Sequence, residues 1–144
     1  MDAWRAKAVV NAANGSTLLG LGVAVLGRAR FSRGPRGLVL ATGYRFALPR
    51  ASAFTVGNVV VTKHDERWWQ RHPRMLLHEE RHSWQYVVTL GLPMLPLYGV
   101  AAAWSCLRGG DLSTHNVFET AAGLEDGGYP LVSRRQRLRL QRTA

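Results

Sequence analysis

The sequence predicts a single domain of the α+β class, in which a small antiparallel sheet from the first half packs beside a helical second half. With 144 residues, the chain is long enough for one sizeable core and too short for two. A run rich in β-branched residues lies before residue 65, and helical periodicity replaces it afterwards. We therefore expect one domain over residues 1–132, followed by a basic tail over residues 133–144.

Two helices are expected at the N-terminus. Residues 2–13 are rich in Ala and Val and carry scattered charges, which predicts a short amphipathic helix ending near residue 14. A cap at Ser16 or Thr17 can start a second, apolar helix that runs to about Gly27. Residues 28–36 hold four Arg and a Gly-Pro turn, which predicts an exposed connection.

The best strand candidates follow this connection. They are Gly37–Phe46 and Ser52–Thr62, and the second is dominated by Val and Thr. The Leu48-Pro49-Arg50 segment between them reads as a turn. We expect the two segments to pair as a hairpin or as parts of one small sheet.

Helices fill the rest of the predicted domain. After Pro73, the run 74–89 contains no helix breaker and should form a helix. A second, apolar helix is expected over 97–107, and a third over about 116–126, before Gly127 and Gly128. The tail from residue 133 holds five Arg and little that can join a core, which predicts a loosely ordered end.

Composition narrows the classes of partner and compartment. The formal charge is +10, but only two of the nineteen basic residues are Lys, and an Arg excess of this kind arises from GC-rich coding alone. We therefore do not expect nucleic acid as a partner, although residues 28–36 and the tail would be the segments to bind it. Cys106 is the only cysteine and allows no internal disulfide. With no secretory pattern at the start, a cytoplasmic location is expected.

The run His78-Glu79-Glu80-Arg81-His82 carries the predicted chemistry. Residues four apart lie on the same face of an α-helix, so His78 and His82 can direct their imidazole nitrogens at one point. Two ligands of a zinc ion are thereby supplied. Glu79 lies beside that point without being a ligand, where its carboxylate can take a proton from a metal-bound water.

A catalytic zinc needs a third protein ligand and leaves its fourth position for water. Glu119 is the preferred candidate, because it lies in a capped helix with small residues that can pack closely against the motif helix. His115 is the alternative ligand, or a hydrogen-bond donor to the oxyanion of a tetrahedral intermediate. Gln85, one turn beyond His82, can contact the substrate or the rim of the site.

The string His78-Glu79-x-x-His82-x-x-Gln85, followed by Asn116-x-x-Glu119-x-x-Ala122, resembles the zincin metallopeptidases in their gluzincin-like form. It is also similar to small, mostly uncharacterised bacterial proteins with the pattern HExxHxxQ and a later NxFE. This resemblance covers about half of the chain. It implies a Zn²⁺-dependent hydrolase acting on a peptide or protein substrate, with His78, His82 and Glu119 as ligands and Glu79 as the base.

Residues 87–107 carry no charge and reach the length of a membrane span. A single crossing would separate His82 from Glu119 by about 30 Å of hydrocarbon, so a shared metal ion excludes it. We expect this segment to be buried in the protein, with peripheral membrane contact as the alternative. The rival to the enzyme hypothesis is a catalytically silent module that binds zinc, a membrane or another protein.

Overall fold

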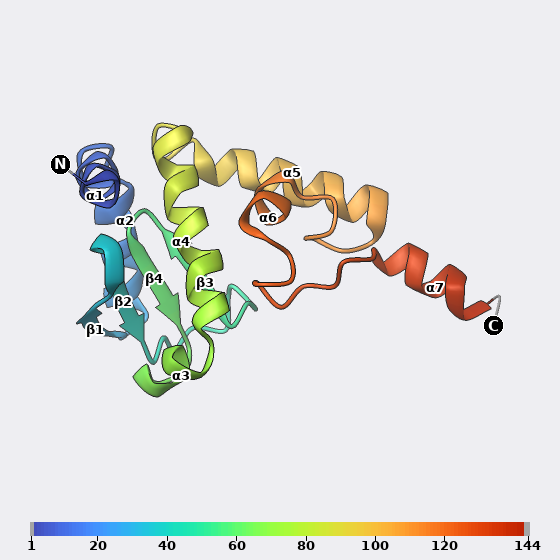
Figure 1. Ribbon diagram of the computed structural model, residues 1–144, viewed down its shortest axis with the longest axis horizontal. Helices are drawn as coiled ribbons and strands as arrows, with labels where there is room; N and C mark the ends of the chain where they lie inside the picture. Colours follow the sequence, from blue (N-terminus) through green and yellow to red (C-terminus); the bar gives the residue numbers. More distant parts are fainter. Residues whose placement is uncertain (1, 143–144) are drawn as a thin grey trace.

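The computed structural model describes residues 2–142, and within them the chain has the predicted α+β composition. Helices run at both ends of the sequence, and the strands lie between them (Figure 1). The elements are α1 Ala3–Ala13, α2 Ser16–Leu26, β1 Arg30–Arg33, the 3₁₀ turn η1 Pro35–Gly37, β2 Val39–Thr42, β3 Ala53–Val56, β4 Val59–Thr62, α3 Glu66–Arg71, α4 Pro73–Val88, α5 Met94–Gly109, α6 Val117–Ala122 and α7 Arg134–Arg142.

The sheet corrects the predicted antiparallel pairing. Its strand order is β1-β2-β4-β3, and β2 pairs with β4 in parallel while the other two pairs are antiparallel. The segment 52–62 is two strands, because Gly57 turns the chain with a φ of 62°. β1 lies inside 28–36, which was expected to be a connection only. After β2 the chain passes the position that β4 later fills and forms β3 on its far side. β3 is therefore an edge strand.

Helices cover both faces of this sheet. On one face α2 packs through small residues, and a Cβ added at Gly20 would lie 2.4 Å from the carbonyl oxygen of Val56. On the other face, α3 brings Trp68 and Trp69 against Leu40 and Val60, and α4 packs against the same cluster through Met75 and Leu76. The result is a three-layer body in which α4 lies directly beside β3 (Figure 1).

Buried polar groups fix α4 against the N-terminal helices. Asn11 of α1 donates to the side-chain oxygen of Asn58 at 3.0 Å and to the carbonyl oxygen of Ser83 at 2.9 Å. Ser83 in turn donates to Asn58 at 3.0 Å. Buried polar groups that find partners specify one packing arrangement. The motif helix is thereby held in register before any metal is considered.

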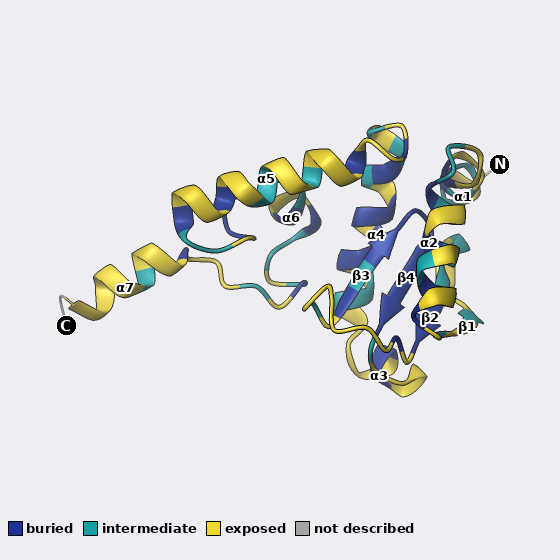
Figure 2. Cartoon of the chain, turned by 180° about the vertical axis from the view of Figure 1, so that it is seen from behind, coloured by how far each residue is buried: buried dark blue, intermediate teal, exposed yellow. Residues whose placement is uncertain are grey.

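The C-terminal third departs most from expectation. Residues 87–107 do not form one buried segment: the chain turns at Leu90 and Gly91, both with positive φ, and α5 then extends away from the sheet (Figure 1). Figure 2 shows that much of α5 is exposed. The next helix, α6, ends at Ala122 rather than near residue 126, because Gly123 adopts a φ of 92°.

The basic tail contains one helix. Within 133–144, residues 134–142 form the helix α7, none of whose residues is buried, and residues 143–144 lie outside those described. Among residues 2–142, no single helix combines the length and apolarity needed to cross a bilayer. α1 and α2 reach them only as a pair, and that pair is bent by 74°.

Candidate metal centre

Two helices bring the predicted ligands together. His78 and His82 lie one turn apart on α4, and their Nε2 atoms are 3.0 Å apart. Glu119 comes from α6, which begins where the side chain of Asn116 accepts from the backbone N–H of Phe118. The Glu119 Oε2 atom lies 3.1 Å from Nε2 of His78 and 3.5 Å from Nε2 of His82. All three side chains are buried.

Hydrogen bonds fix the tautomer of each histidine. His78 Nδ1 lies 3.0 Å from the carbonyl oxygen of Gly123, which only accepts, so Nδ1 carries the proton. His82 Nδ1 lies 2.8 Å from Oε1 of Gln85, whose Nε2 donates to the carbonyl oxygen of Phe118 at 2.8 Å. That second bond orients the amide so that its oxygen faces His82. In its neutral form, each imidazole therefore keeps a lone pair on Nε2.

Three lone-pair-bearing atoms consequently face one another, with separations of 3.0, 3.1 and 3.5 Å. Oε2 of Glu119 is buried and accepts no hydrogen bond from residues 2–142, and the three candidate ligand atoms lie within 4.8 Å of one another. Such an arrangement is repulsive unless a cation or a proton lies among the atoms. A tetrahedron with arms of about 2.0 Å, the Zn–N distance, has edges of about 3.3 Å. The observed separations fit that metal.

Glu79 lies beside the cluster and is held by a residue of the edge strand. Thr55 of β3 donates its hydroxyl to Oε2 of Glu79 at 2.6 Å. Burial raises the pKa of Glu79, and the neighbouring His82 and the bond from Thr55 offset part of that rise. A buried carboxylate with a raised pKa, fixed by one hydroxyl, is suited to accept and return a proton.

Glu119 has the opposite protonation behaviour. Burial alone would raise its pKa, but a proton on Nε2 of His78 or His82 that hydrogen-bonds to the carboxylate outweighs burial and lowers the pKa to about 2. Its other oxygen, Oε1, accepts a short hydrogen bond from the hydroxyl of Tyr98 on α5. Burial and the nearby Glu119 raise the pKa of Tyr98, so this phenol stays protonated. The carboxylate is therefore kept ionised, as a metal ligand must be.

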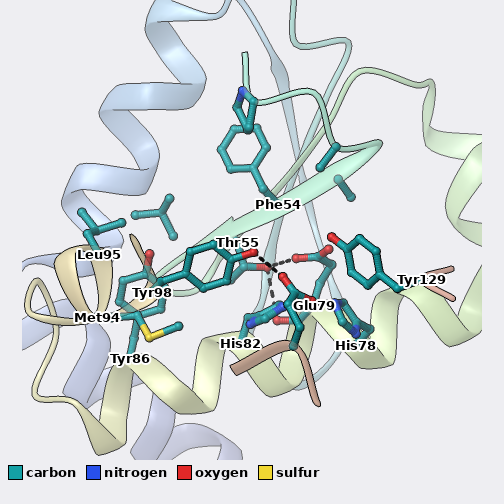
Figure 3. A pocket seen from close by; sticks show the side chains of 15 residues that line it. Phe54, Thr55, His78, Glu79, His82, Tyr86, Met94, Leu95, Tyr98 and Tyr129 are labelled. Atoms are coloured by element: carbon teal, nitrogen blue, oxygen red, sulfur yellow. Dashed lines mark hydrogen bonds and ion pairs between the residues drawn. The ribbon is translucent and has the colours of Figure 1, made fainter. Parts of the chain in front are cut away.

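The cluster opens into a largely apolar cavity of about 250 Å³. One wall is β3, including Phe54 and Thr55, and another is the first turn of α5, with Met94 and Leu95. Figure 3 shows Tyr98 and Tyr129 on opposite sides of the cluster. Carboxylates and imidazoles thus lie at one end of a pocket whose other surfaces are aliphatic and aromatic, a usual composition for a ligand site.

The loop after α6 covers His78. Gly127 lies so close that an added Cβ would be 2.6 Å from Cε1 of the imidazole. Asp126 in the same loop bonds to Arg81 at 2.6 Å and to Arg74 at 2.7 Å, both on α4. The motif helix therefore holds the loop that supplies the hydrogen-bond acceptor for His78.

The other predicted site residues lie in different positions. Gln85 directs its amide at His82 and Phe118 and so orients the His82 imidazole, and contact with substrate stays a prediction. His115 does not join the cluster: its backbone N–H bonds to the hydroxyl of Ser105, and its ring lies against Gly109 at the far end of α5. It lies in the turn before α6 begins, so it shares no helical face with Glu119.

Thr55, Gly127 and the carbonyl of Gly123 were not predicted. Each acts through its position in the fold, and no local motif marks them. Tyr98 was considered as a phenol near the site, but no spacing placed it.

No family model, curated protein or solved structure matches this chain. What the site can do therefore rests on its own geometry.

Proposed function

We propose that this protein is a zinc-dependent hydrolase, and that its reaction is the cleavage of a peptide bond. The observation that carries the proposal is the convergence of His78, His82 and Glu119, whose candidate ligand atoms lie within 4.8 Å of one another. One of these atoms, Oε2 of Glu119, is buried and accepts no hydrogen bond from the described residues. A purely structural cluster would place a hydrogen bond there. Two His and one carboxylate form a common ligand set for catalytic zinc.

Zinc, when bound, would supply Lewis acidity toward water and toward a carbonyl oxygen. Glu79 accepts the proton of the attacking water and then donates it to the leaving amine. Thr55 keeps the Glu79 carboxylate in place through its hydroxyl at 2.6 Å. Gln85 keeps the lone pair of His82 directed into the cluster. Tyr98 holds the second oxygen of Glu119.

The position of the edge strand supports a peptide as substrate. β3 is the last strand of the sheet, so one row of its backbone groups has no partner strand. Four residues of β3, Ala53 to Val56, line the cavity beside Glu79. An extended peptide can add to such an edge through backbone hydrogen bonds and place its side chains in the neighbouring pocket. The apolar lining favours an apolar side chain there.

The first test is metal content per chain, measured by elemental analysis after dialysis against a weak chelator. We expect about one zinc in the wild type and little in Glu119→Ala. Glu79→Gln should retain zinc and lose turnover of peptide substrates. A folded wild type without metal would refute the proposal. A wild type that binds zinc but cleaves no peptide, and that Glu79→Gln does not alter, would favour the rival, a zinc-binding module without turnover.

A further inference from the structure

The outer face of α5 is apolar along almost its whole length. Four large side chains, Leu97, Val100, Trp104 and Leu107, are 48–71% exposed. At 3.6 residues per turn they fall within an arc of about 80° on one side of the helix. We call these four residues the α5 stripe. A helix that faces water normally carries polar residues on its outer face, so this face is suited to a partner.

The buried residues of α5 lie on the opposite side. Met94, Ser105 and Gly109 are buried, and they turn toward α4, α6 and the turn before α6. The α5 stripe therefore lies on the side of α5 that faces away from these contacts, and Figure 2 shows exposed residues along α5 where it extends from the sheet. From Met94 to Leu107 the helix contains no charged residue.

Positive charge is concentrated where the α5 stripe ends. The guanidinium carbon of Arg108 lies 5.7 Å from the centroid of the Trp104 ring. The helix α7 starts beside the same end, since Arg135 donates to the carbonyl oxygen of Arg108 at 3.4 Å. α7 contains five Arg and no acidic residue, and none of its residues is buried. The α5 stripe, which includes Trp104, is thus bordered at one end by a group of Arg residues.

We propose that the α5 stripe docks on the surface of an anionic lipid bilayer, with Arg108 and α7 near the headgroups. Apolar side chains that enter the headgroup boundary and Arg residues that attract anionic lipids are the two contributions that bind interfacial helices. Tryptophan favours the same boundary. The net charge of +10 complements an anionic surface. This inference does not depend on the metal or on hydrolysis.

The test is sedimentation of the full chain with lipid vesicles. We expect binding to vesicles of phosphatidylglycerol and phosphatidylcholine in equal parts, much weaker binding to phosphatidylcholine alone, and weakening by added salt. Val100→Asp should reduce binding about tenfold or more, because it removes an inserted apolar side chain and adds a repelled charge. Val9→Asp is the matched control, since Val9 is an exposed residue of α1. Circular dichroism checks that both variants fold.

Three outcomes would overturn the proposal. One is the absence of vesicle binding, or equal binding to the two kinds of vesicle. Another is an equal loss in Val9→Asp and Val100→Asp, which would remove the assignment to the α5 stripe. The last is a dimer of the wild type in light scattering that Val100→Asp converts to a monomer, which would make a second copy of the chain the occupant of this face.

Discussion

Gln85 tests the argument that the hydrogen-bond partners of the histidines prepare the metal site. Its Oε1 accepts from Nδ1 of His82 at 2.8 Å, and its Nε2 donates to the carbonyl oxygen of Phe118 at 2.8 Å. Gln85→Leu removes both bonds. Loss of such an outer partner costs roughly 10–100-fold in metal affinity. The unpaired carbonyl of Phe118 should in addition lower the free energy of unfolding by about 1 kcal/mol or more.

The assay is competition for zinc with a chromophoric chelator, followed by urea unfolding of the metal-free protein. Gln85→Glu keeps an acceptor for His82 but loses the donor to Phe118, so it should bind zinc nearly as well as the wild type while remaining less stable. Gln70→Leu, the same change at an exposed position of α3, should alter neither quantity. If Gln85→Leu bound zinc as tightly as the wild type, the hydrogen bond from His82 to Gln85 would not be what prepares His82 for the metal.

Three further changes test other parts of the structure. Thr55→Val should leave zinc content unchanged but raise the pKa of Glu79, because a hydrogen bond to the ionised form is lost, and the acidic limb of the rate profile should move to higher pH by about one unit. Gly127→Ala should lower zinc affinity, because the added methyl carbon would lie 2.6 Å from the ring of His78. Lys7→Met should change the free energy of unfolding at neutral pH by no more than about 1 kcal/mol, since Glu80 keeps its ion pair with Arg36 while a buried charge is replaced by an apolar chain of similar size.

The Lys7 variant also carries a prediction about pH. Lys7 is fully buried, and burial lowers its pKa, partly offset by Glu80. The unfolded state therefore binds more protons between the lowered pKa and the ordinary value of about 10.4, so this group makes the folded state more stable as pH rises through that window. The difference in unfolding free energy, wild type minus Lys7→Met, should increase with pH there. A pH-independent difference would contradict the lowered pKa.

Matched controls separate these effects from general damage. Thr55→Ser keeps the hydroxyl and should retain the wild-type pH profile. Gly22→Ala adds the same methyl group on α2, where nothing lies within 4 Å, and should leave zinc affinity unchanged. A shift of the rate profile in Thr55→Ser, or a loss of zinc in Gly22→Ala, would mean that the assays report global stability rather than the site.

The helices and the ligand set were predictable because their signals are local. Residues four apart on a helix share a face regardless of the tertiary structure. The spacing of His78 and His82 therefore predicted that their side chains lie together, as they do in the structure. Pro73 and the breaker-free run after it marked α4 within a residue of its observed bounds. Glu119 was the preferred third ligand because small residues follow it on a short helix, and the structure caps that helix at Asn116.

Non-local features were not predictable in the same way. The parallel pairing of β2 with β4 depends on where the chain goes between residues 42 and 53, which no local pattern encodes. Thr55 bonds to Glu79 because the edge strand β3 lies beside α4, and this arrangement depends on the strand order. The apolar run 87–107 looked like core because hydropathy does not distinguish a buried helix from one that exposes its apolar face. The prediction for His115 was wrong for a local reason. Asn116 caps α6, so His115 precedes the helix and shares no helical face with Glu119.

The origin of Glu119 in α6, well separated in sequence from α4, has a consequence for how long the chain survives proteolysis. A metal ion shared by both helices would act as a cross-link that closes the loop containing α5. Without the ion, the C-terminal third stays attached through the Asp126 ion pairs, the bonds of His78 and Gln85, and the packing of Met94 against Val56 and Tyr86. We expect trypsin to cut first at arginines in this third when zinc is removed, leaving the sheet and α1 to α4 as a resistant fragment.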